Sequence, residues 1–149
     1  MKPIQTILYA TDFSDSSLPA CEYAVYLAQL AGARLQVLHV IGEFADKRKS
    51  RIQPETLALL EREVEIQAFK SMEEFCHDHI GTTVACDSEV VMGLPFQEIL
   101  KQAEAIDADL IVIGSHGRTG LEHVLVGSTA ERLVRRSVRP VLTIRSRGV

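Results

Sequence analysis

The stretch IVIGSHGRTGLEHVLVGSTAERLV, residues 111–134, contains the change of pattern that decides the fold. It begins with apolar residues typical of a buried strand, continues through a loop rich in glycine, and ends in a helical pattern. We expect a strand over residues 108–114 and a helix over residues 128–137. A buried strand that leads through a glycine-rich loop into a helix is typical of α/β proteins.

The same alternation of strand and helix runs through the whole chain. Short apolar runs that end at polar or glycine residues predict buried strands, and apolar residues recurring every three or four positions predict helices. Ser14 or Asp15 is expected to cap the first helix, which ends near Gly32. The expected strands span residues 6–13, 33–42, 82–93, 108–114 and 139–145, and the expected helices span residues 14–32, 54–79, 94–106 and 128–137.

This order of elements predicts a single α/β domain over residues 1–149. Strands separated by helices form parallel sheets through right-handed crossovers, so we expect a doubly wound five-stranded parallel sheet with helices on both faces. The strands read as nearly continuous apolar runs, as strands covered on both faces do.

Composition argues against several classes of function. The net charge of −4 argues against a general nucleic-acid binder, because such proteins carry a basic face. The basic run at 47–51 has acidic neighbours and is interpreted as a solvated loop. No apolar run approaches the roughly 20 residues of a membrane span. The N-terminus lacks the pattern of a signal peptide, so we expect a cytoplasmic protein without membrane insertion.

The cysteines fit the same interpretation. Cys21, Cys76 and Cys86 are odd in number and form no CxxC pattern. They do not indicate a disulfide framework, which agrees with a reducing cytoplasm.

In sheets of this kind, ligands bind beyond the carboxyl ends of the strands, where the strand order reverses. The loops after the first, second and fourth strands are therefore expected to meet at one crevice. These loops contain residues 10–12, residues 39–41 and the glycine-rich stretch.

The glycine-rich stretch has the features of an anion site. Gly117 allows the backbone to turn and expose its N–H groups. Gly127 precedes a helix whose first N–H groups lack intrahelical partners and attract an anion together with the helix dipole. Ser128 and Thr129 add hydroxyl donors for phosphate oxygens. In the alternative interpretation, Ser128 and Glu131 form a capping box that satisfies the helix start without a ligand.

Two common phosphate-binding motifs are absent from the sequence. There is no G-x-x-x-x-G-K-[ST], so the stretch is not a P-loop. There is no G-x-G-x-x-G either, which disfavours a dinucleotide site.

The whole chain resembles the universal stress protein family. The matching segments are ILYATDFSDSS near the start, LHV at the end of the second strand, GLPFQEIL, ADLIVIGSHGRTG and VLVGSTAERLVRRSVRPVL. Gly114, Gly117, Gly127 and Ser128 complete the G-x2-G-x9-G-[ST] pattern that marks the ATP-binding branch of that family. The resemblance implies an adenine nucleotide alpha hydrolase-like fold with strand order 3-2-1-4-5, and a nucleotide-binding homodimer with a regulatory role in stress.

The resemblance also implies roles for individual residues. Asp12 is expected to meet the adenine or ribose edge, and Val40 to contact adenine. Many family members have proline where this chain has Ala10, which leaves the loop less rigid but keeps Asp12 in place. The predicted ligand is ATP, with Mg²⁺ bridging its phosphates. The predicted nucleotide-binding residues are Ala10, Thr11, Asp12, Val40, Gly114, Ser115, His116, Gly117, Arg118, Gly127, Ser128 and Thr129.

The last strand is the dimer edge that the resemblance implies, through Val141, Leu142 and Ile144. An exposed apolar edge strand invites aggregation, so pairing at this edge makes physical sense.

Other polar residues also bear on function. Arg118 suits a phosphate because a guanidinium pairs well with it. His116 either approaches a γ-phosphate or is a solvated loop residue, His123 is expected at the surface, and His39 is expected to be structural. The run at 76–79, Cys-His-Asp-His, shows no complete ligand set, so no metal site is predicted.

Three functions remain open from the sequence. The first is a regulatory protein that binds ATP and responds to it by a change of state. The second is a slow ATPase or phosphoryl-transfer enzyme, disfavoured because no lysine and no paired carboxylates accompany the glycine-rich stretch, so no catalytic residue is assigned. The third is a dimeric adaptor that binds no nucleotide. AMP, ADP and cyclic nucleotides also remain open as ligands.

Overall fold

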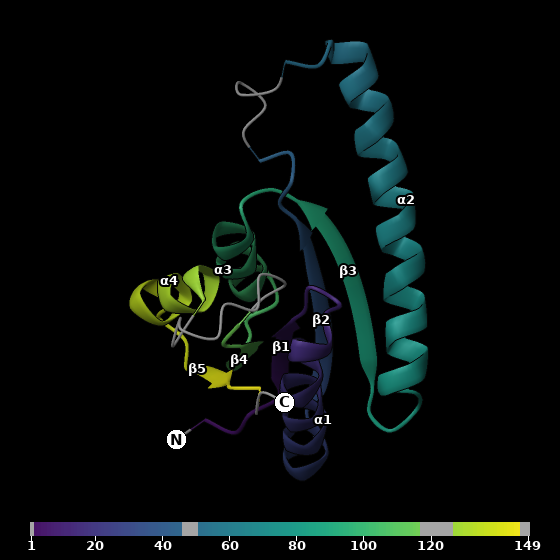
Figure 1. Ribbon diagram of the computed structural model, residues 1–149. Coiled ribbons are helices and arrows are strands. Elements are labelled where there is room, and N and C mark those ends of the chain that lie inside the picture. Colours follow the sequence, from purple (N-terminus) through teal and green to yellow (C-terminus); the bar gives the residue numbers. More distant parts are fainter. Residues whose placement is uncertain (1, 46–50, 117–126, 147–149) are drawn as a thin grey trace.

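The computed structural model describes residues 2–45, 51–116 and 127–146, and within them a five-stranded sheet carries helices on both faces (Figure 1). The strands are parallel and lie in the order β3-β2-β1-β4-β5, as predicted. The strands are β1 (Thr6–Ala10), β2 (Arg34–Ile41), β3 (Cys86–Met92), β4 (Leu110–Gly114) and β5 (Val141–Ile144). The helices are the 3-10 helix η1 (Asp15–Ser17), α1 (Leu18–Ala31), α2 (Pro54–His79), α3 (Pro95–Ala105) and α4 (Ser128–Arg136).

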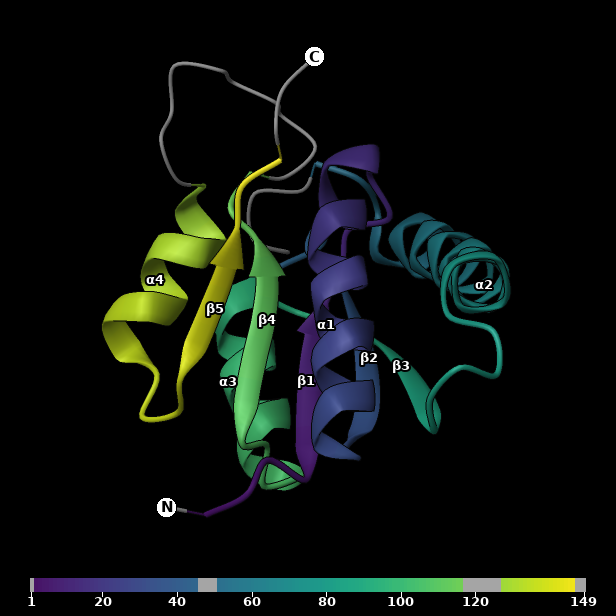
Figure 2. The ribbon, with the colours of Figure 1, turned by 90° about the horizontal axis from the view of Figure 1, so that it is seen from below.

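Each face of the sheet has its own hydrophobic core. Side chains alternate along β1, so Ile7 and Tyr9 pack with α1 and α2, whereas Leu8 and Ala10 pack with α3 and α4. Figure 2 shows α1 in front of the sheet and α3 behind it. Burial on both faces explains why the central strands are continuous apolar runs. Among the described residues, no helix is long and apolar enough to cross a membrane.

All five strands are shorter than predicted, and for β1 and β3 the backbone shows why. β1 ends at Ala10 rather than at residue 13, because the backbone of Phe13 adopts φ 65° and turns the chain out of the sheet. β3 begins at Cys86 rather than at residue 82, because the chain first turns after α2. In that turn the N–H of Gly81, at φ 60°, donates to the carbonyl of Cys76 over 2.8 Å.

The predicted cap of the first helix is wrong. α1 begins at Leu18, after the turn η1, and neither Ser14 nor Asp15 caps it. The hydroxyl of Ser17 instead donates to the carbonyl of Ser14 at 2.8 Å and lies 2.9 Å from the hydroxyl of Thr11. The start of α1 is therefore tied to the end of β1 by hydroxyl groups. The helix ends at Gly32 with φ 66°, as predicted.

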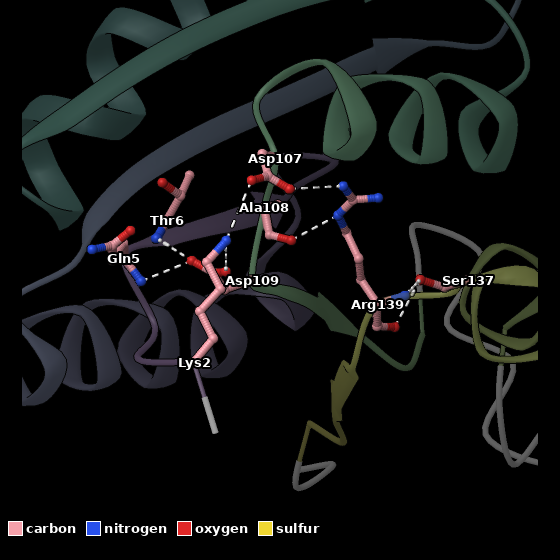
Figure 3. A network of polar contacts seen from close by, with 8 residues as sticks. All are labelled: Lys2, Gln5, Thr6, Asp107, Ala108, Asp109, Ser137 and Arg139. Carbon is pink, nitrogen blue, oxygen red and sulfur yellow. Dashed lines mark hydrogen bonds and ion pairs between the residues drawn. The ribbon is translucent and has the colours of Figure 1, made fainter.

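A polar network joins the residues just before β1, β4 and β5, at the amino ends of these strands (Figure 3). One carboxylate oxygen of Asp109 accepts the backbone N–H groups of Gln5 at 2.8 Å and Thr6 at 3.0 Å. Arg139 donates to the carbonyl of Ala108 over 2.7 Å and to the carboxylate of Asp107 over 3.2 Å. The network links the three segments that lead into β1, β4 and β5. It therefore fixes the register of these strands relative to one another at their amino ends.

The two aspartates of this network differ in exposure. The side chain of Asp109 is 13% exposed and that of Asp107 is 75% exposed. Backbone N–H donors, first that of Gln5, hold the pKa of Asp109 below its usual value. The hydrogen bond from Arg139 does the same for the pKa of Asp107. Because a surface ion pair contributes little, Asp109 is expected to contribute more to stability than Asp107.

We expect Asp109→Asn to lower the free energy of unfolding by about 1–2 kcal/mol, because charge-assisted bonds to two backbone donors are weakened. The matched control Asp107→Asn keeps a residue that tolerates φ 51° and should cost less than Asp109→Asn, because the ion pairs of Asp107 are exposed to solvent. Urea unfolding measures both. A lowered carboxyl pKa contributes stability that is fully present above the unfolded pKa of roughly 3.9 and is lost as the pH falls through the lower folded pKa. The difference between the parent and Asp109→Asn should therefore shrink over that range. Equal losses in the two variants would contradict this ranking.

Candidate functional site

A cavity of about 240 Å³ lies at the carboxyl ends of β1, β2 and β4, on the face covered by α3 and α4. This is the point where the strand order reverses, as predicted for a ligand site in a doubly wound sheet. The cavity is lined by Ala10, Thr11, Asp12, Ser17, Leu38, Val40, Pro95, Ile99, Ile113, Gly114, Ser115, His116, Gly127, Ser128, Thr129 and Ala130.

One wall of the cavity is apolar. Leu38 and Val40 come from β2, Ile113 from β4 and Ile99 from α3, and all four belong to the core beneath α3 and α4. The residue between the two β2 positions, His39, points to the other face by the alternation of the strand. An apolar wall of this kind accepts a flat hydrophobic ring.

His39 has a structural role, as expected. It is 7% exposed, and its Nδ1 lies 2.8 Å from the carbonyl of Thr11. Its ring stacks on Phe13 with 4.2 Å between the ring centroids. These contacts hold the loop after β1 in its left-handed turn at Phe13.

Several hydrogen bonds hold the loop that contains Asp12 in its conformation. The N–H of Phe13 donates to the hydroxyl of Thr11 at 3.0 Å, and the buried hydroxyl of Tyr9 donates to the carbonyl of Ser17 at 2.8 Å. The carboxylate of Asp12 accepts the N–H of Ser14 at 2.9 Å through Oδ1, and the hydroxyl of Ser14 bonds the same oxygen. Asp12 thus stabilises the turn, and the same residue lines the cavity.

The other side of the cavity is the start of α4. Gly127 is the N-cap residue, and no side chain forms a capping hydrogen bond there. The capping-box interpretation is therefore wrong: Ser128 is already helical, and the carboxylate of Glu131 instead pairs with Arg135 at 3.0 Å. A helix start without a side-chain cap presents N–H groups and the positive end of its dipole to the cavity.

Backbone contacts hold this helix start against the end of β4. The N–H of Gly127 donates to the carbonyl of Ser115. The N–H of Ser115 in turn donates to the carbonyl of Ile144 in β5 over 2.9 Å, and its hydroxyl lies 3.0 Å from Nδ1 of His116. A Cβ atom at position 127 would meet the carbonyl oxygen of Ser115 at 2.9 Å, so glycine is required there.

The predicted nucleotide-binding residues that the structure describes all line this one cavity. Gly117, Arg118 and His123 lie outside the described residues. Sequence reasoning missed Ser17, Leu38, Pro95, Ile99, Ile113 and Ala130. The sequence contains a signal for only some of these residues. Leu38 and Ile113 each lie two positions from a predicted site residue in the same strand, and so face the same side. No spacing in the sequence indicates that Pro95 and Ile99 of α3 reach the cavity.

The Cys-His-Asp-His run does not assemble a ligand set. Within the described ranges, no three His, Cys, Asp or Glu side chains gather where they could hold a metal ion. His77 lies beside Asp78 at 3.1 Å on the surface, and His79 packs on the ring of Phe75.

Comparison with known proteins gives the same fold. Residues 3–145 match the model of the universal stress protein family. Universal stress protein MJ0531 of Methanocaldococcus jannaschii is 33% identical over 93% of this chain and 81% of its own. The solved structure of MJ0577 from the same organism is 30% identical to this chain and has a TM-score of 0.86. The alignment covers 99% of this chain and 100% of the MJ0577 chain. A universal stress protein solved in complex with cAMP is 24% identical to this chain, with a TM-score of 0.68. The alignment covers 97% of this chain and 98% of that protein's chain.

We expect Gly127→Ala to lower the free energy of unfolding by about 1–3 kcal/mol, because the added methyl group meets the Ser115 carbonyl and α4 must shift. Gly114→Ala is the matched control, since a Cβ there finds its nearest neighbour, the carbonyl oxygen of Ser16, at an ordinary 3.5 Å. Thermal and urea unfolding measure both variants. A Gly127→Ala protein as stable as the control would show that the helix start is not held in the way described.

Proposed function

The chain belongs to the universal stress protein family, and from that premise we propose that it binds an adenine nucleotide, with ATP as the principal ligand, in the cavity at the carboxyl ends of its strands. The observation that carries the proposal is the meeting of an apolar wall and an uncapped helix start in one cavity. Adenosine needs the first surface and phosphates need the second.

The dimensions of the cavity suggest how the nucleotide lies. Its volume of about 240 Å³ is below the roughly 300–1,000 Å³ of typical ligand pockets, so it suits the base and ribose, with the phosphates extending toward solvent. In this arrangement adenine lies against Val40 and Ile99, and Asp12 meets the adenine or ribose edge. The phosphates lie at Gly127, Ser128 and Thr129, with Mg²⁺ held through the phosphate oxygens.

The family supports an adenine ligand, because a relative of the same fold was solved in complex with cAMP. Gly117 and Arg118 remain predicted phosphate contacts. We also propose that the bound nucleotide acts as a regulatory signal, because the hydrogen bond from Ser115 to Ile144 connects the phosphate end of the cavity to β5.

Binding is favoured over turnover by the groups that line the cavity. Among its described lining residues, Asp12 and His116 alone have ionisable side chains. Efficient phosphoryl transfer needs several positioned charges and an oriented nucleophile. Slow hydrolysis of ATP is therefore the most that we propose for this site.

We further propose that two chains pair through β5. This strand is at the edge of the sheet, and Val141, Leu142 and Ile144 are only half-buried in it. Val138, just before the strand, is 93% exposed, so a second chain would cover apolar surface here.

Ser128→Glu tests the phosphate site. A carboxylate in the first turn of α4 suits the helix dipole, so stability should be unchanged or slightly higher, while repulsion should weaken ATP binding at least tenfold. The control Ser128→Gln has similar size without the charge and should lose less than half as much binding energy. Isothermal titration of nucleotide-free protein with Mg²⁺-ATP measures both, and adenosine affinity should hardly change.

If nucleotide-free parent protein binds neither ATP nor adenosine, the adaptor function replaces this proposal. Phosphate release at the rates of ordinary enzymes, roughly 1–1,000 per second, would instead support the enzyme.

Thr143→Lys tests the dimer edge. A lysine in an edge strand opposes pairing with another strand, so the variant should be monomeric in sedimentation velocity at concentrations where the parent is a dimer. Circular dichroism should show that the fold is retained. A parent that sediments as a monomer at tens of micromolar, as an order of magnitude, would refute pairing through β5.

A further inference from the structure

Two arginines of α4 lie over the same aromatic ring. The guanidinium carbon of Arg132 is 5.1 Å from the centre of the Phe96 ring, and that of Arg136 is 4.9 Å from it. Phe96 is near the start of α3 and only 6% exposed, so its ring is held by the core beneath α3 and α4. A guanidinium can stack on a ring and still direct its N–H groups to an anion.

This pair of arginines lacks an anionic partner in the part of the chain that the structure describes. Neither Arg132 nor Arg136 forms an ion pair or a side-chain hydrogen bond with another described residue. By contrast, Arg135 of the same helix pairs with Glu131 at 3.0 Å. Arg132 and Arg136 are both exposed, and their like charges share one ring. An anion placed beside them would relieve this repulsion.

The pair lies next to the rim of the nucleotide cavity. Ser128 of α4 and Pro95 of α3 line that cavity, and the two helices pack side by side (Figure 1). Arg132 is one turn after Ser128 on the same face of α4, and Phe96 directly follows Pro95. Side chains of a helix lean toward its N-terminus, so Arg132 leans toward the cavity end of α4. Arg136 is one turn farther away.

The cavity itself offers little positive charge. Among its described lining residues, Asp12 and His116 alone have ionisable side chains, and neither is a permanent cation. The start of α4 contributes only about half an elementary charge through the helix dipole. A triphosphate carries several negative charges, and the last phosphate extends farthest from the base. That phosphate therefore needs a cation at the rim.

We propose that Arg132, held over Phe96, binds the terminal phosphate of the nucleotide and makes the site selective for a triphosphate over a monophosphate. This inference rests on the proposed function, because it places a further contact on the same ligand. A guanidinium forms two parallel hydrogen bonds with phosphate oxygens, which suits a phosphate at the open end of the cavity. The single phosphate of AMP ends at the start of α4 and leaves Arg132 without a ligand contact.

Arg132→Gln tests the proposal, because it shortens the side chain and removes the charge. Isothermal titration of the nucleotide-free full chain with Mg²⁺-ATP should show affinity about three- to tenfold weaker than in the parent. Affinity for AMP and for adenosine should stay within about twofold, which a merely structural role of Arg132 would not produce. Arg132→Lys keeps the charge without the planar fork and should recover part of the ATP affinity.

Two other arginines supply matched controls. Arg136→Gln removes the same charge and a contact with the same ring, so its thermal stability should match that of Arg132→Gln. Arg135→Gln removes the same charge from a side chain that pairs with Glu131. Both variants should bind ATP within about twofold of the parent at about 0.15 M salt, where charges more than roughly 8 Å from the ligand are largely screened.

The outcomes separate this inference from the proposed function. An equal loss of ATP affinity in all three glutamine variants would show a general effect of charge and would overturn the role of Arg132. An equal loss for ATP and AMP in Arg132→Gln would overturn the assignment to the terminal phosphate. A parent that binds AMP as tightly as ATP also overturns the inference, but it leaves the adenine site in place. A parent that binds neither ATP nor adenosine overturns the proposed function and this inference with it.

Discussion

The hydrogen bond between the N–H of Gly127 and the carbonyl of Ser115 is the contact on which the candidate site depends. It fixes the start of α4 against the end of β4, and so sets the uncapped helix turn opposite the apolar wall formed by β2 and α3. A side chain at position 127 would occupy the space that the Ser115 carbonyl needs. The glycine is therefore required first by backbone packing, and the position of the uncapped N–H groups at the start of α4 follows from that packing.

The parallel sheet brings the remaining parts of the site to the same place. Because the strands are parallel, the loops after β1, β2 and β4 begin at the same end of the sheet, the carboxyl end (Figure 2). The register of the strands is secured at their amino ends. There Asp109 holds the chain entering β1, and Arg139, just before β5, holds the chain entering β4 (Figure 3). This polar network lies at the amino ends of the strands, and the candidate binding surface lies at their carboxyl ends.

Most of the architecture could be predicted from the sequence, because hydrophobic periodicity and the order of elements are local signals. The loop residues of the site could be predicted because the topology states where such loops meet. The contribution of Pro95 and Ile99 to the cavity wall could not be predicted, because it depends on how far α3 extends over the sheet. The capping box at Ser128, the alternative interpretation of this helix start, is absent although its sequence pattern is present, because Gly127 takes the N-cap position and Glu131 pairs with Arg135.

The central claim is that the uncapped start of α4 receives the phosphates of an adenine nucleotide bound in the cavity. Amide chemical shifts of nucleotide-free protein, followed by NMR during titration with Mg²⁺-ATP, test it most directly. We expect the largest shifts at Gly127, Ser128 and Thr129, and smaller shifts at Val40 and at residues 114–116. With adenosine alone, the amides of Gly127, Ser128 and Thr129 should hardly shift. Shifts confined to other surfaces, or none at saturating ATP, would contradict it.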